Sequence, residues 1–321
     1  MPKIATIGDV NVDLITRIDR MPDLGKQVVT RDFEVHGGGC SANFALQSAR
    51  LGMDVQLFGK LGDDVFGTRV LVELDDNRVN TKNVRMTEKK TGVTVAIVQG
   101  IERSFITFRG ENATYNINDI DLPSIEAEVV HLPSYFLLDG LRSDYGHLID
   151  LLHGAGILVS FDTGWDPMGF PKERIEPILD ILPKIDIFLP NLDEARKILG
   201  DDRLTREKAA RIFLDMGVRI AAIKMGKDGC FLASGDYQEF VPAFKVPVVD
   251  TTGAGDTFDA GFVSAYVSGH SLKECAYIGA ATAGLKVGGI GWSKYPTRQN
   301  VNRFLEENRI SNSEGSGPLQ L

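Results

Sequence analysis

Short runs of branched apolar residues recur along the chain, and most of them end at Gly, Asp, Asn or Pro. Continuous stretches of Ile, Val and Leu are typical of strands that are buried on both faces of a parallel sheet. On this pattern, the sequence predicts buried strands over the segments Ile4–Ile7, Val55–Phe58, Val129–Leu132, Ile157–Phe161, Ile185–Leu189 and Ile220–Ile223.

Segments in which apolar residues follow helical spacing lie between these runs. The first of them stops at Gly52, and glycine is a common terminator of helices. Because strands and helices alternate, we expect an α/β fold with a mainly parallel sheet. The predicted helices are Ala42–Leu51, Phe66–Asp76, Tyr145–His153, Leu192–Leu199 and Thr205–Met216.

Two regions depart from this rhythm, residues 13–35 and 91–109, where apolar and polar residues alternate more regularly. Such alternation is typical of half-exposed antiparallel strands, so we expect a small sheet that projects from the main domain.

From about Ile310 the composition changes to Ser, Asn and Gly. This change predicts a tail that is mobile or held only by contacts with other molecules.

The chain has 321 residues and a formal net charge of -9. An acidic balance argues against nucleic acid and anionic membranes as partners, because both favour a basic surface. The N-terminus lacks the apolar region of a signal peptide, and no uncharged run approaches membrane-spanning length, so we expect a cytoplasmic protein. Cysteines and histidines show no metal-ligand spacing, and no histidine is assigned to catalysis.

The strongest chemical signal lies in residues 246–263. An apolar strand is expected to end at Asp250, and a helix is expected from about Asp256 to Gly269. Phosphate is commonly bound at such a helix N-terminus, where the helix dipole places partial positive charge. The loop before the helix has small residues whose backbone N–H groups can approach an anion closely, namely Gly253, Ala254 and Gly255.

Asp256 is an unexpected residue for a loop that only binds phosphate, because its charge would repel the ligand. The position is sensible if the carboxylate accepts the proton of an attacking hydroxyl. The loop amides would then stabilise charge on the transferred phosphoryl group. The alternative is that Asp256 is only the N-cap of the helix, a common role for aspartate.

Residues 250–263 resemble the second signature of the ribokinase-like (PfkB) carbohydrate kinase family. Residues 37–62, which begin Gly-Gly-Gly-Cys-Ser-Ala-Asn, resemble its first signature, and the two motifs follow the family's order. The resemblance covers about residues 3–305. It implies a ribokinase-like fold in a kinase domain of residues 1–308, with a β-sheet lid from about 13–35 and 91–109, and a flexible tail at 309–321.

The resemblance also implies ATP and Mg²⁺ as cofactors. Asn191 and Glu194 match the family's Asn-x-x-Glu motif, which organises Mg²⁺ and its waters near the phosphates. Mg²⁺ keeps several waters and takes few direct carboxylate ligands, so contact through water is expected. The alternative is a helix capping box, with Asn191 as the N-cap and Glu194 as its partner.

Residues 224–230 resemble the family's nucleotide loop, in which Thr or Ser commonly occupies the position of Lys224. Lys224 either contacts a nucleotide phosphate as a point charge or points to solvent. Gly226 and Gly229 either allow the backbone to approach the nucleotide or form an ordinary glycine turn.

A monovalent cation such as K⁺ is a further candidate. In many relatives the residues that match Asp250 and Thr252, together with carbonyl groups near Gly291, hold such an ion. Residues 280–291 are rich in Ala and Gly and resemble the stretch that borders the adenine in relatives. A helix of small residues also serves close packing, so both interpretations stay open.

The substrate side of the resemblance involves four residues. In relatives the residues that match Asp13 and Asn43 accept or make hydrogen bonds with substrate hydroxyls, while Gly38 and Gly39 leave room for the substrate. A carboxylate and an amide suit a polyol, which needs several rigidly held hydrogen-bonding groups. The alternative for Asp13 is a turn or an exposed position on the lid.

Two arginines flank a predicted lid strand, Arg103 and Arg109. An inward-pointing arginine could bind an acidic or phosphorylated substrate bidentately, and we favour Arg109 for this role. The alternative is an exposed arginine. Residues 162–167 lack the further Arg that sugar-acid and hexose kinases of the family often have after this strand, which weakens an assignment to 2-keto-3-deoxygluconate.

The leading hypothesis is an ATP-dependent phosphotransferase that acts on a hydroxyl of a small sugar or sugar derivative, with Asp256 as general base. A nucleoside kinase of the same fold is an alternative. A non-catalytic sugar sensor is another, although a sensor has no need for Asp256. No Gly-x-Gly-x-x-Gly follows the first strand and no P-loop motif occurs, which argues against a dinucleotide oxidoreductase or a P-loop kinase.

Lids of relatives often pair, so a homodimer through the lid is a further expectation.

Overall fold

The computed structural model describes residues 3–30, 32–99, 102–312 and 317–321. The strands of its larger sheet are β1 (Lys3–Ile7), β4 (Asp54–Gly62), β5 (Asn80–Thr87), β8 (Val129–Leu132), β9 (Leu158–Phe161), β10 (Ile187–Phe188), β11 (Ile220–Lys224), β12 (Cys230–Ser234) and β13 (Tyr237–Val241). Their order in space is β13-β12-β11-β10-β9-β8-β1-β4-β5. Neighbours from β11 to β5 are parallel, and β12 and β13 add an antiparallel edge. The expected mainly parallel sheet is therefore confirmed.

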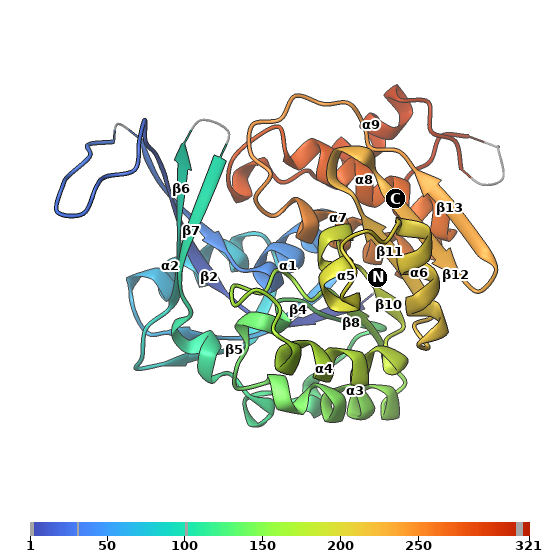
Figure 1. Ribbon diagram of the computed structural model, residues 1–321, viewed down its shortest axis with the longest axis horizontal. Coiled ribbons are helices and arrows are strands. Elements are labelled where there is room, and N and C mark those ends of the chain that lie inside the picture. Colours follow the sequence, from blue (N-terminus) through green and yellow to red (C-terminus); the bar gives the residue numbers. More distant parts are fainter. Residues whose placement is uncertain (1–2, 31, 100–101, 313–316) are drawn as a thin grey trace.

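Helices cover both faces of this sheet (Figure 1). They are α1 (Cys40–Arg50), α2 (Val65–Asp76), α3 (Tyr145–Gly154), α4 (Lys172–Ile181), α5 (Leu192–Leu199), α6 (Arg206–Asp215), α7 (Ala254–Val267), α8 (Leu272–Lys286) and α9 (Arg298–Glu307). Successive strand residues point to opposite faces. Ile4 thus belongs to the core beneath α1, α7 and α8, whereas Ala5 and Ile7 belong to the core beneath α3 to α6. None of the described helices is long and apolar enough to cross a membrane.

The predicted strands and helices form close to their expected bounds, with one exception. The strand expected to end at Asp250 is absent, because residues 242–249 belong to no strand. Val248 and Val249 are instead 63% and 54% exposed. The backbone N–H of Val249 donates to the carbonyl of Val287 at 2.8 Å. An apolar run has the same sequence pattern whether it enters a sheet or lines a ligand cavity, and only the tertiary structure separates the two.

A second sheet projects from the main domain and forms the lid (Figure 1). Its strands are β2 (Asn11–Arg17), β3 (Phe33–Gly38), β6 (Gly92–Gln99) and β7 (Glu102–Phe108), in the order β3-β2-β6-β7. The pair β2–β6 is parallel, so the expectation of an all-antiparallel lid is wrong for this pair. Since β1 leads into β2 and β3 leads into α1, both ends of the first lid hairpin are anchored in the main domain.

The expectation of a mobile tail is wrong for the described residues near the end of the chain. Leu319 is fully buried in the core, and its backbone N–H donates to the carbonyl of Ile310 at 2.8 Å. The N–H of Leu321 donates to the side chain of Asn302 in α9 at 2.8 Å. A composition-based prediction missed this contact because a single apolar side chain can anchor an otherwise polar segment.

Leu319→Ala is expected to destabilise the protein by about 2–5 kcal/mol, because it removes a buried side chain and leaves a cavity. Urea unfolding followed by circular dichroism measures this change. Gln320→Ala is the matched control, because Gln320 is exposed beside it. Equal stability of both variants would show that the tail does not contribute to the core in solution.

Candidate active site

The loop before α7 adopts a conformation that depends on glycine. Gly253 is the N-cap of α7 with φ of 74°, in the left-handed region. A Cβ atom at this position would lie 2.5 Å from the hydroxyl of Tyr295. The side chain of Asp250 accepts the N–H of Thr252 at 3.0 Å, and Ala254 N–H donates to the carbonyl of Thr251 at 3.1 Å. The turn therefore leads into the N-terminus of α7 through glycines whose missing side chains let Tyr295 and Lys224 approach the backbone.

Asp256 lies in the first turn of α7, three residues beyond the N-cap, so the alternative of a simple N-cap is wrong. Its side chain is buried, and its Oδ2 accepts a hydrogen bond from Nδ2 of Asn43 at 2.7 Å. Burial raises the pKa of Asp256 above its usual value, while the hydrogen bond from Asn43 opposes that shift. A buried carboxylate at a helix N-terminus is suited to accept a proton from a bound group.

Asn43 is held in one orientation by a residue that sequence reasoning missed. The indole N–H of Trp292 donates to Oδ1 of Asn43 at 2.6 Å. Because indole nitrogen is only a donor, this contact identifies the Asn43 oxygen and turns the amide N–H₂ toward Asp256. Trp292 also packs where a Cβ at Gly37 would lie, 2.1 Å from its ring. No local pattern around Trp292 marked it as part of the site.

Asp13 and Asp9 bring two further carboxylates to the base of the lid. Asp9 is buried and accepts hydrogen bonds from Ser134 at 2.6 Å and from Asn11 at 3.2 Å. Burial raises the pKa of Asp9 to about 6 and that of Asp13, with added repulsion from nearby carboxylates, to about 7. A Cβ at Gly38 would lie 2.4 Å from the Asp13 carboxylate, so Gly38 makes room for this side chain. Asp9 was missed because a Gly-Asp pair after a strand is typical of ordinary turns.

Gly39 is the residue that joins the lid to α1. It is the N-cap of α1 with φ of 92°, and a Cβ there would lie 2.6 Å from the carbonyl oxygen of Asp9. The structure therefore gives Gly39 a backbone role between two segments.

Lys224 does not point to solvent, which removes one of the two alternatives. Its Nζ lies in a buried cluster, 2.8 Å from Asp162 and 2.9 Å from both carboxylate oxygens of Asp259. Burial alone would lower the pKa of Lys224, but these two charges outweigh it and raise the pKa. The same Nζ lies 3.5 Å from where a Cβ of Gly255 would be, directly behind the loop.

Asn191 and Glu194 form the capping box of α5. The side chain of Asn191 accepts the N–H of Glu194 at 2.8 Å, and Glu194 accepts the N–H of Asn191 at 2.9 Å. Burial and then the charge of Asp162 raise the pKa of Glu194 to about 8. The capping alternative is thus present in the structure. A role toward Mg²⁺ is compatible with it, because each side chain keeps a further lone pair.

Gly226 and Gly229 lie in the turn between β11 and β12, with φ of 54° and 108°. A Cβ at Gly229 would lie 2.1 Å from the carbonyl oxygen of Val241, so packing against β13 already requires glycine there. No atom lies within 4 Å of a Cβ at Gly226. Gly226 remains the better candidate for approach to a nucleotide.

Arg109 lies beyond the end of β7, where it forms an ion pair with Asp139. It lines neither of the cavities described below. Its assignment to substrate therefore stays a prediction. The side chain of Arg103 lies outside the described residues.

Asp250 and Thr252 lie together at the start of the loop, as the expected cation site requires. A third residue, Lys286 at the end of α8, reaches the same place. Its Nζ lies 3.1 Å from both the backbone oxygen and Oδ2 of Asp250. The sequence did not indicate this contact, because Lys286 is distant from Asp250 in the chain and ends a helix that is rich in small residues.

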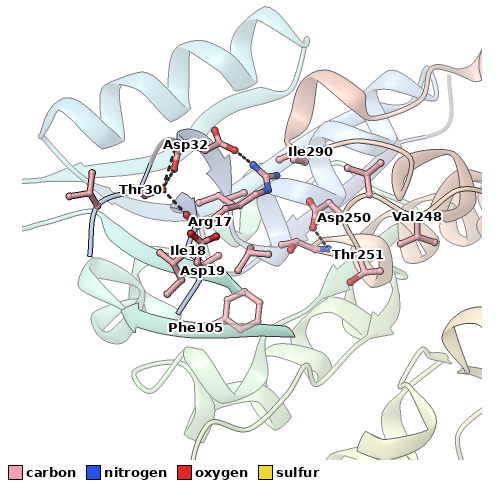
Figure 2. Close-up of a pocket in the computed structure, with 16 residues that line it drawn as sticks. Arg17, Ile18, Asp19, Thr30, Asp32, Phe105, Val248, Asp250, Thr251 and Ile290 are labelled. Carbon is pink, nitrogen blue, oxygen red and sulfur yellow. Dashed lines mark hydrogen bonds and ion pairs between the residues drawn. The ribbon is translucent and has the colours of Figure 1, made fainter. Parts of the chain in front are cut away.

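A cavity of about 1290 Å³ separates the lid from the loop that precedes α7. Figure 2 shows Arg17, Thr30 and Phe105 of the lid region facing Val248 and Thr251 across it. A smaller cavity of about 20 Å³ shares Ile15, Asp250 and Thr252 with the large one, and its other lining residues include Asp13, Asn43, Trp292, Tyr295 and Lys286. The lid and loop thus enclose a large cleft that ends in a tight acidic pocket.

Comparison with known proteins places this geometry in a family. The family model "pfkB family carbohydrate kinase" matches residues 1–298. An uncharacterized sugar kinase of Archaeoglobus fulgidus is 31% identical over 80% of the chain and 99% of its own length. Ribokinase of Arabidopsis thaliana, solved with ribose and ATP, has a TM-score of 0.81 at 28% identity and covers 94% of the chain and 98% of its own. Nucleoside kinase of Methanocaldococcus jannaschii has a TM-score of 0.80 at 25% identity, and the match covers 96% of the chain and 99% of the nucleoside kinase. The chain belongs to the pfkB family of carbohydrate kinases and has their ribokinase-like fold, and it is an enzyme that transfers phosphate to a hydroxyl group.

Proposed function

We propose that Asp256 is the general base in transfer of the γ-phosphate of ATP to a hydroxyl of a small neutral sugar or nucleoside. The observation that supports this most directly is the buried Asp256 carboxylate behind a glycine turn, held by Asn43 at 2.7 Å. Asn43 occupies Oδ2 of the carboxylate, so Oδ1 is the oxygen that we assign to the substrate proton. A base must be within hydrogen-bond reach of the proton that it removes.

The transfer forms one P–O bond and breaks another. The acceptor oxygen attacks the γ-phosphorus as its proton passes to Asp256, and the bond to the β-phosphate oxygen breaks to release ADP. The N–H of Ala254 is used by the carbonyl of Thr251, whereas the N–H groups of Gly255 and Asp256 in the first turn of α7 have no acceptor within the helix and are available to the transferred group. Lys224 lies behind Gly255, where it is paired with Asp162 and Asp259 and supports the loop from its inner side.

The wall that contains Val248 and Val249 is suited to a nucleotide. Both side chains are exposed next to the anion-binding turn, and both line the large cavity. Apolar side chains beside a phosphate site provide a surface for a flat base. We therefore place ATP between this segment and the turn between β11 and β12.

Mg²⁺ fits the acidic side of this region. Glu194 has a pKa raised to about 8 by burial and by Asp162, which is the state expected of a carboxylate whose counter-charge arrives with the ligand. Asn191 and Glu194 would hold the ion through its waters, and bound Mg²⁺ supplies charge neutralisation for the phosphates. Their capping bonds position both side chains for this role.

The acidic pocket favours a neutral acceptor. Asp13 and Asp250 line the small cavity, and Asp256 is close enough to Asp13 to raise its pKa. Carboxylates accept hydrogen bonds from hydroxyl groups. An anionic sugar acid or sugar phosphate would be repelled there. The lysine and arginine that line the two cavities are already in ion pairs, Lys286 with Asp250 and Arg17 with Asp32 and Glu34.

A nucleoside is the second candidate, and the large cavity favours it. The lid wall carries Ile15, Ala96, Val98 and Phe105, which offer an apolar surface for a base attached to the sugar. The nucleoside kinase among the relatives is in keeping with such a substrate.

The lid also offers a surface for self-association, and we include a homodimer in the proposal. Three apolar side chains on the lid face opposite the cavity are more than half exposed, namely Phe33, Ile106 and Phe108. Exposed apolar patches of this kind commonly mark protein interfaces.

Asp256→Asn is expected to lower kcat by about 10²–10⁴, the range for loss of a general base. The measurement is coupled ADP release with Mg-ATP, alongside ATP binding by calorimetry, which should be retained. Asp236→Asn, an exposed carboxylate in a distant turn, is the control. Near wild-type turnover of Asp256→Asn would remove this residue from the role of base.

The acceptor class is tested in the same assay with pentoses, hexoses, nucleosides, sugar acids and sugar phosphates. We expect turnover on neutral pentoses, hexoses or nucleosides and none on the anionic compounds. Preference for an anionic acceptor would contradict the argument from the acidic pocket. If a compound binds but the wild type turns over none of the panel, and Asp256→Asn behaves in the same way, the result would favour a sugar sensor.

Asp13→Asn is expected to raise the melting temperature of the ligand-free protein above neutral pH. The folded pKa of about 7 lies above the unfolded value near 3.8, so ionisation of Asp13 opposes folding. The free energy of unfolding therefore falls as pH rises through this window, and the variant escapes that loss. Calorimetry at about pH 8 should show the gain, which shrinks toward about pH 4. A gain that is independent of pH would contradict this assignment.

A further inference from the structure

Lys286 is a buried cation at a point where the chain itself provides oxygen ligands. It is the last residue of α8 and is 1% exposed. Its Nζ lies 3.1 Å from the backbone oxygen of Asp250 and 3.1 Å from Oδ2 of the same residue. Lysine is almost never fully buried unless it is paired, so the contact with Asp250 accounts for its position.

The contact acts on the turn that carries the proposed catalytic base. Oδ1 of Asp250 accepts the N–H of Thr252 at 3.0 Å, while Oδ2 and the backbone oxygen face Lys286. Asp250 thus connects the end of α8 to the turn that leads through Gly253 into α7. The negative end of the α8 dipole also favours an ammonium group in its last turn.

This arrangement does not fit a free monovalent cation, which the family resemblance had suggested for Asp250 and Thr252. Both a carboxylate oxygen and the main-chain oxygen of Asp250 already bind an ammonium group of the same charge. An additional K⁺ on these oxygens would lie beside that ammonium and be repelled by it in a site with little water.

We propose that the ammonium group of Lys286 replaces the monovalent cation, so that the loop before α7 is held in its active geometry without K⁺. Lys286 is then a positioning residue that acts through Asp250, and not a group that touches the reacting atoms. The proposal rests on the phosphotransferase function described above. It predicts an enzyme that is indifferent to K⁺.

The first test uses the wild-type protein in buffers that contain only tetramethylammonium as the monovalent cation. K⁺ then replaces tetramethylammonium stepwise at constant ionic strength, and kcat and KM are measured by ADP release at each step. We expect both constants to stay unchanged. A rise in kcat of about tenfold or more on adding K⁺ would overturn the proposal.

Lys286→Ala is the second test, because it removes the ammonium and leaves the oxygens of Asp250. Without K⁺, kcat should fall by about 10², the scale for loss of a fixed electrostatic contact near a transferred group. K⁺ or NH₄⁺ should restore most of it, and tetramethylammonium should not, because it is too large for the space. Lys273→Ala, at an exposed position on the same helix, is the control.

Full activity of Lys286→Ala without K⁺ would overturn the proposal, and so would inactivity in a folded variant that neither K⁺ nor NH₄⁺ relieves. If the variant does not fold, the wild-type test still decides.

Melting temperature provides a readout that needs no acceptor. K⁺ should raise the melting temperature of Lys286→Ala above its value in tetramethylammonium and leave that of the wild type unchanged. This pattern without phosphate transfer to any acceptor would support the role of Lys286 while contradicting the proposed function. A wild-type protein that K⁺ stabilises as much as it does Lys286→Ala would overturn the role of Lys286, whatever its kinase activity.

Discussion

The hydrogen bond from Asn43 to Asp256 is the interaction on which the proposed site depends. It joins the start of α1, which follows the first lid hairpin, to the start of α7, more than half the chain away. Trp292, from a third segment, fixes the orientation of the Asn43 amide. Three segments must therefore pack correctly before the carboxylate acquires its partner. Burial raises the pKa of Asp256, and the contact with Asn43 limits that rise, which keeps the group available as a base.

Two buried lysines support the same loop from different sides. Lys224 lies among Asp162 and Asp259 behind Gly255, and Lys286 holds Asp250 at the other end of the turn. A buried ion pair is weak evidence for stability, because desolvation offsets the attraction, but loss of one partner leaves an uncompensated charge. Such pairs suit the positioning of a loop, because an alternative loop conformation would leave a buried charge without its partner and without water. The loop is thus defined by charge as well as by its glycines.

Much of the architecture could be predicted from the sequence. The buried strands appear as continuous apolar runs because both of their faces are covered by helices, and α5 was predicted at its observed bounds. Gly253, Gly255 and Asp256 were identified because a glycine turn before a helix has a known affinity for anions. The sequence identified Lys224 as a candidate residue but did not reveal its ion-pair partner. That partner, Asp162, follows a different strand.

The sequence by itself determined the fold class, the lid and the identity of the candidate base, because these follow from local periodicity and from two contiguous motifs. Only the tertiary structure decided what surrounds that base. Trp292, Asp9 and Lys286 contribute to the site although the sequence assigned none of them a role, and Val248 lines a cavity although its pattern suggested a strand. The physical reason is that burial, partner and charge are properties of packed neighbours. Residues distant along the chain supply them, and a local pattern does not encode them.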